Sequence, residues 1–120
     1  MENSEDTRSP VEKLVMAYLL SALKQGATTV IVRVDDRGAG VLEMIVNGQL
    51  RVDTNPPAQL IPPIVRMLGI MASLPVHAKG ETAVGRIELL VAERTAWFDV
   101  EVRGHDKSLR AKVSVLGYLA

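Results

Sequence analysis

Apolar residues first recur three and four positions apart, which is the spacing of one face of an amphipathic helix. The residues before this run are typical of a helix start: Ser9 caps it, Pro10 takes its first position, and Glu12 reaches back to the cap. Gly26 supplies the left-handed residue that ends many helices. The pattern predicts a helix from Pro10 to about Gln25.

After this helix the hydrophobic period changes to two, and β-branched residues become frequent. Thr28 to Val34 is expected to form a strand that ends at a polar turn. Two further strands, Val41 to Val46 and Gln49 to Thr54, flank Asn47-Gly48, a dipeptide that favours the two-residue type I′ turn. The pattern therefore predicts a β-hairpin.

The short turn sets which residues lie opposite each other: Ile45 and Leu50, and Glu43 and Val52. Leu42 and Met44 are expected on the other face of the hairpin, beside Arg51 and Asp53. Both faces are thus partly apolar. Either helices cover both sides, or one face meets a partner.

Four prolines mark the next segment. Pro56-Pro57 ends the preceding strand, and Pro62-Pro63 belongs in the first turn of a second helix that reaches about Ser73. This turn is the position where helices tolerate proline, since its N–H groups have no partner within the helix.

Three strands are expected in the rest of the chain, at about 84–91, 96–103 and 108–116. Four-residue loops between them would place Arg86 and Arg110 opposite Glu101, and Lys112 opposite Asp99. In all, the pattern predicts an α+β fold, with a curved, mainly antiparallel sheet of about six strands and two helices. Residues 10–117 would form a single domain after a flexible tail, 1–9.

Composition excludes several classes of function. The 120 residues include 14 Lys and Arg against 14 Asp and Glu, so the chain lacks the basic excess of a nucleic-acid or polybasic membrane binder. The longest apolar stretch, residues 60–76, contains Arg66 and several prolines, which argues against membrane insertion. The absence of cysteine fits a cytoplasmic location.

No catalytic, metal-binding or cofactor-binding constellation is evident, so the chain is not expected to be an enzyme. The glycines at Gly80 and Gly85 have the spacing of a phosphate-binding loop. Such a loop needs Lys and then Ser or Thr after the second glycine, whereas Arg86 and Ile87 stand here.

Several short segments taken together resemble the PAS-like domain that precedes the ATPase core of type II secretion and type IV pilus ATPases. The segments are Pro10-Val11-Glu12-Lys13-Leu14-Val15, Gly26-Ala27-Thr28, Ile45 to Leu50, Pro56-Pro57, Ile70-Met71-Ala72-Ser73-Leu74 and Gly85-Arg86-Ile87. The resemblance covers about Pro10 to Leu116. It implies a PAS-like fold that packs in a hexamer and places basic residues near the phosphate end of a nucleotide.

Departures from the family limit what is carried over. Thr28 to Arg33 stand where the family has an acid and a histidine, and Asp99 stands where a strand arginine is expected. The basic candidates to face a phosphate are therefore Arg86, Lys79 and Arg66. For Arg86, an ion pair with Glu101 is the alternative.

The resemblance implies a diverged, stand-alone accessory domain without the ATPase core, although a piece of a longer ATPase is the alternative. We expect a non-catalytic interaction or assembly module that binds a protein of a secretion or pilus machine or forms a homo-oligomer. Leu42, Met44, Met16 and Leu20 are the candidate apolar interface residues. The alternative function is a PAS-like small-ligand sensor with a pocket lined by Met44, Met67 and Phe98.

Overall fold

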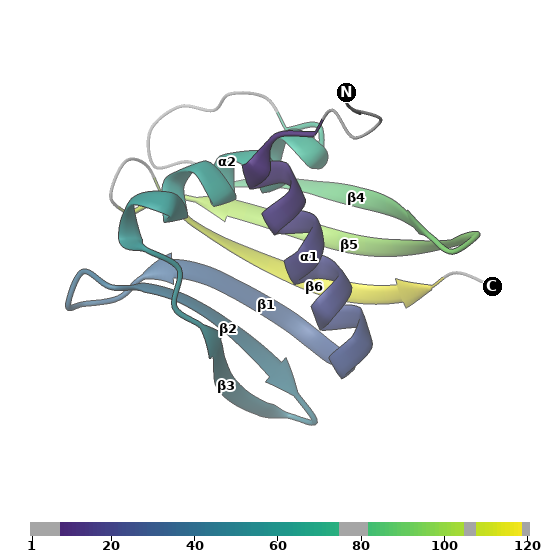
Figure 1. Ribbon diagram of the computed structural model, residues 1–120, viewed down its shortest axis with the longest axis horizontal. Helices are drawn as coiled ribbons and strands as arrows, with labels where there is room; N and C mark the ends of the chain where they lie inside the picture. The colour runs from purple at the N-terminus through teal and green to yellow at the C-terminus, as the bar shows by residue number, and fades with distance from the viewer. Residues whose placement is uncertain (1–7, 75–81, 105–107, 119–120) are drawn as a thin grey trace, which may run out of the picture.

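A six-stranded sheet carries two helices on one of its faces (Figure 1). The computed structural model describes residues 8–74, 82–104 and 108–118. The strand order is β3-β2-β1-β6-β5-β4, all neighbours are antiparallel, and the sheet does not close. The α+β class predicted from the sequence is confirmed. The elements are α1 (Pro10–Gln25), β1 (Ala27–Val34), β2 (Gly40–Val46), β3 (Gln49–Thr54), the 3₁₀ turn η1 (Ala58–Leu60), α2 (Ile61–Met71), β4 (Ala83–Val91), β5 (Arg94–Arg103) and β6 (Arg110–Tyr118).

The first helix begins and ends where its capping residues predict. The Ser9 hydroxyl accepts a hydrogen bond from the Glu12 N–H at 3.1 Å. Gly26 has φ of 73°, and its N–H donates to the last carbonyls of the helix. Residues 1–7 of the predicted tail lie outside the described residues, and its last residue, Ser9, belongs to the helix start.

The β2–β3 hairpin also forms as predicted. Asn47 and Gly48 have φ of 54° and 77°, as a type I′ turn requires. The expected pairs of Ile45 with Leu50 and of Glu43 with Val52 are present. Beyond Glu43 the register shifts, so Leu42 lies opposite Thr54 and not beside Asp53.

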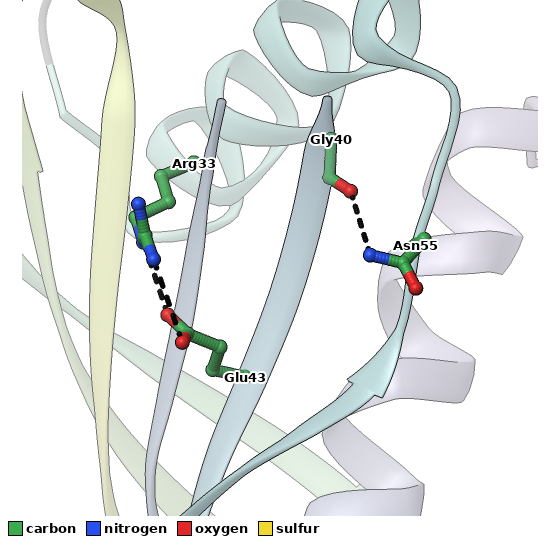
Figure 2. Close-up of polar contacts among 4 residues, drawn as sticks. All are labelled: Arg33, Gly40, Glu43 and Asn55. Carbon is green, nitrogen blue, oxygen red and sulfur yellow. Dashed lines mark hydrogen bonds and ion pairs between the residues drawn. The ribbon is translucent and has the colours of Figure 1, made fainter. Parts of the chain in front are cut away.

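A side-chain hydrogen bond ties the connection between β3 and α2 to the start of β2. The Asn55 amide Nδ2 donates to the Gly40 carbonyl at 3.1 Å (Figure 2). The helix α2 then begins with Pro62 and Pro63 in its first turn, where their missing N–H groups cost no helical hydrogen bond. It ends at Met71, about two residues earlier than predicted.

The predicted register of β4 against β5 is wrong by two residues. Ala92 and Glu93 alone form the turn, with φ of 48° and 70°, so the connection is shorter than the expected four residues. Arg86 consequently lies opposite Asp99 and not opposite Glu101. Because side chains alternate with a period of two, the shift leaves every residue on its predicted face.

The predicted register of β5 against β6 is also wrong by two residues, in this case because the connection is longer than expected. The strand β5 ends at Arg103 and β6 begins at Arg110, and Glu101 lies opposite Lys112. Asp99 lies opposite Ser114. The shift again preserves the faces.

The core lies between the two helices and one face of the sheet, called here the helix face. One continuous cluster joins buried residues of α1 and α2 to those of all strands except β3. Its largest fully buried side chains include Phe98, Leu19, Leu42, Met44, Ile61, Ile64 and Ile87. The opposite face of the sheet is called the open face.

Candidate interaction surfaces

The open face can be mapped strand by strand from the registers. One row across the sheet, from β3 to β4, runs Val52, Glu43, Ile31, Lys112, Glu101, Val84. The next row runs Leu50, Ile45, Thr29, Ser114, Asp99, Arg86. Apolar side chains therefore gather toward the β3 end of both rows, and charged side chains dominate toward β5.

The apolar end of the open face is a cluster of four side chains from β1, β2 and β3. Leu50 and Val52 are 56% and 55% exposed, and Ile31 and Ile45 beside them are half-buried. We call these four residues the hairpin patch. Its aliphatic side chains offer no charge, so apolar burial is the interaction that they favour.

One ion pair borders the hairpin patch. Glu43 lies between Ile31 and Val52 in the row and is only 8% exposed. The Arg33 Nε donates to its carboxylate at 3.0 Å, as Figure 2 shows for these neighbouring strands. This hydrogen bond is the main cause that raises the pKa of Arg33 above its ordinary value. The pair therefore neutralises the acid that lies between Ile31 and Val52.

At the far side of the sheet, the outer strand β4 presents two charged side chains between two apolar ones on the open face. Val84 and Leu90 are 67% and 73% exposed, and between them lie Arg86 and Glu88. We call these four residues the β4 edge. It lies along the upper border of the sheet in Figure 1.

The Arg86 guanidinium is held against its own sheet. Its Nε donates to Asp99 at 2.7 Å, and its guanidinium carbon lies 5.8 Å from the centre of the Trp97 ring. The hydrogen bond to Asp99 raises the pKa of Arg86 and lowers the pKa of that carboxyl. The Trp97 Nε1 is buried and has no hydrogen-bond partner among the described residues.

The basic residues expected to face a phosphate do not form one site. Arg86 lies on the open face of β4, whereas Arg66 is exposed on α2, which packs on the helix face. Lys79 lies outside the described residues. The sheet separates the two described arginines, so they cannot bind the same anion.

The predicted apolar interface residues are mostly in the core. Leu42 and Met44 are completely buried under the helices, so the expectation that they face a partner is wrong. Met16 is half-buried against the core, and its sulfur accepts a hydrogen bond from Arg8 at 2.8 Å. Only Leu20, on α1, is substantially exposed, at 39%.

The sequence interpretation missed the exposure of Leu50 and Val52 because it expected Leu42 and Met44, on the other face of the hairpin, to be the exposed apolar residues. A signal was present in β1, where Thr29 and Arg33 alternate with the apolar Val30 and its neighbours. Polar residues at this spacing mark the solvent side of a strand. Pairing β1 with β2 would then have placed Leu50 and Val52 on that same side.

Within residues 8–74, 82–104 and 108–118, no group of three or more His, Asp or Glu is placed to hold a metal ion. No helix in the described part of the chain has the length and apolar character needed to span a bilayer.

The chain matches no protein-family model and no curated protein. The resemblance to secretion and pilus ATPase domains therefore stays a prediction.

Proposed function

We propose that the chain is a non-catalytic protein-binding module that uses the hairpin patch to bind an apolar surface of a partner. The resemblance in sequence suggests a component of a type II secretion or type IV pilus machine as that partner, in the cytoplasm. The proposal includes no cofactor and no nucleic acid. The PAS-like character of the fold belongs to the same proposal.

The observation that carries the proposal is the exposure of the hairpin patch. Leu50 and Val52 are each more than half exposed to water, and both lie next to partly exposed isoleucines. Burial of apolar surface is favourable by about 25 cal/mol per Å². Because α1 and α2 pack on the other face of the sheet, they leave the hairpin patch uncovered. A partner that covers the patch gains this free energy.

The burial of the residues assigned to a sensor pocket favours binding of a protein over sensing of a ligand. Met44 and Phe98 are fully buried in one continuous cluster, and Met67 packs against the same cluster. These side chains contact the core of the domain itself. The non-catalytic part of the proposal rests on the sequence, since Arg86 stands where a phosphate-binding loop needs lysine.

The proposal is tested by using this chain to capture its partners from the native cells. The wild type is compared with three lysine variants. The first, Leu50→Lys with Val52→Lys, places charge on the hairpin patch. The second, Ile70→Lys, is the matched control, because Ile70 is 66% exposed on α2, on the helix side. The third, Leu20→Lys, tests the exposed side of α1.

We expect the wild type and the Ile70 variant to retain the same secretion or pilus component, and the hairpin variant to lose it while its circular dichroism stays native. The purified component should bind the hairpin variant at least about tenfold more weakly, given the apolar area removed. Loss of binding with Leu20→Lys instead would assign the interaction to α1. Equal binding by all variants, or no partner of this class, would contradict the proposal.

A further inference from the structure

The strand β4 ends the sheet and has a hydrogen-bonded neighbour on one side only, β5, in the sheet that the structure describes. It spans Ala83–Val91 and contains no proline, so its outer main chain is able to pair with another strand. We infer that a second copy of this chain pairs with β4, antiparallel and centred on Ile87. The inference does not rest on the proposed function, which uses the hairpin patch at the opposite end of the sheet.

The backbone geometry determines which residues of β4 can hydrogen bond to a new strand. Ala92 and Glu93 form a two-residue turn, so Val91 and Arg94, which flank it, form a hydrogen-bonded pair. Hydrogen-bonded and non-bonded pairs alternate along an antiparallel ladder. The N–H and C=O groups that point away from β5 therefore belong to the four residues of the β4 edge.

In the register centred on Ile87, the β4 edge is complementary to itself. Val84 lies opposite Leu90 of the second copy, and Arg86 lies opposite Glu88. By the two-fold symmetry each of these contacts occurs twice. Apolar residues thus meet apolar residues and opposite charges meet, which are the pairs that stabilise neighbouring strands.

The neighbouring registers that use the same outward main-chain groups are unfavourable. If the pairing moves by one such register in one direction, Arg86 of one chain lies opposite Arg86 of the other. If it moves in the other direction, Glu88 lies opposite Glu88. Like charges directly opposite each other destabilise a pair of strands. The alternation of charge along the β4 edge therefore selects one register.

The exposed side chains and the ion pair on the open face fit this arrangement. Val84 and Leu90 are 67% and 73% exposed. In the dimer, Val84 of each chain would be covered by Leu90 of the other chain. Arg86 already contacts Asp99 on its own sheet and would lie between two carboxylates, Asp99 and the copy's Glu88. Antiparallel pairing would place the helices of both copies on the same side and join their open faces.

Sedimentation velocity of the full chain over a range of concentrations tests the inference. We expect a concentration-dependent dimer that Glu88→Arg weakens by at least about tenfold, because two opposite-charge contacts become like-charge contacts. Adding Arg86→Glu to that variant restores opposite charges between the two copies and should recover part of the dimerisation, since the new carboxylate also lies opposite Asp99. Asp36→Arg, an equal charge change in the exposed turn after β1, is the matched control and should dimerise as the wild type does.

Cysteine pairing tests the register, since the chain has no native cysteine. A mixture of Arg86→Cys and Glu88→Cys chains should form a disulfide-linked dimer, because facing residues in hydrogen-bonded pairs have Cα atoms about 5.5 Å apart. Either variant alone should not. A monomer at all concentrations, an unchanged dimer in Glu88→Arg, or no cross-link in the mixture would overturn the inference. So would loss of the dimer in the Leu50→Lys, Val52→Lys variant, which would assign self-association to the β3 end.

Discussion

Substitution of Gly40 by alanine tests how tightly the segment before α2 packs on the start of β2. A Cβ at this position would lie 2.0 Å from the Pro56 carbonyl oxygen and 3.2 Å from the Ile61 side chain. Contacts below 3.0 Å force a shift, so Pro56 would have to move by about 1 Å. The atom that blocks the Cβ is main chain, which cannot rotate away.

The expected loss of stability has two parts. Overpacking of a well-packed site costs about 1–3 kcal/mol, and Ile61, which is completely buried, would be displaced as well. Movement of the segment also strains the hydrogen bond from Asn55 to the Gly40 carbonyl, worth about 1 kcal/mol. We therefore expect Gly40→Ala to lower the free energy of unfolding by about 2–4 kcal/mol.

Urea unfolding followed by circular dichroism measures this difference. With a slope of about 2 kcal/mol per M, the midpoint should fall by roughly 1–2 M while the slope stays unchanged. Gly69→Ala is the control, because its Cβ would have no neighbour nearer than 4.0 Å and alanine favours the helix, so stability should rise by up to about 1 kcal/mol. A free energy of unfolding for Gly40→Ala within about 0.5 kcal/mol of the wild type would contradict close packing of Pro56 on Gly40.

Three further predictions concern ion pairs, acid stability and the first helix. Arg33→Met should lower stability by about 1–3 kcal/mol in urea unfolding because it leaves the buried carboxylate of Glu43 unpaired, and adding Glu43→Leu should recover most of that loss. The pKa values of Asp35 and Asp99 lie below their usual range, because Asp35 accepts a hydrogen bond from a backbone N–H and Asp99 accepts one from an arginine. Both carboxylates therefore stabilise the fold at pH values above the unfolded-state pKa. This stability is lost as the pH falls through the folded-state pKa values. Replacing both with asparagine should flatten the loss of thermal stability below about pH 4, and an unchanged acid profile would contradict this assignment. Ser9→Ala should lower stability by about 1 kcal/mol in thermal unfolding through loss of the helix cap, with Ser9→Asp as the variant that keeps it.

The elements could be predicted because the residues that determine them are adjacent in sequence. The cap at Ser9, the stop at Gly26 and the turn at Asn47-Gly48 act within a few residues of the structure that they form. The pairing of the β2–β3 hairpin as far as Glu43 and Val52 followed from that turn alone. No long-range information was needed for any of them.

Two registers were mispredicted because their connections carry no such signal. Ala92 and Glu93 both adopt positive φ, which residues other than glycine and asparagine rarely do, so the sequence favours a longer loop at this point. The connection from β5 to β6 begins at Gly104, but nothing in the sequence marks where the next strand starts. Tertiary packing determines both registers, because it buries residues such as Phe98 and Val113 on the helix face.

Errors of register and errors of face have different consequences for function. A shift by two residues leaves the core composition intact, so the fold class is correct even though Arg86 pairs with Asp99. The same shift changes the charge contacts among β4, β5 and β6 on the open face. An error of face has a larger effect. Because Leu42 and Met44 are buried on the helix face, the candidate surface lies on the opposite side of the sheet from the one predicted. A binding surface on a sheet can therefore be argued only after both the register and the covered face are known, and here both place the exposed Leu50 and Val52 on the open face.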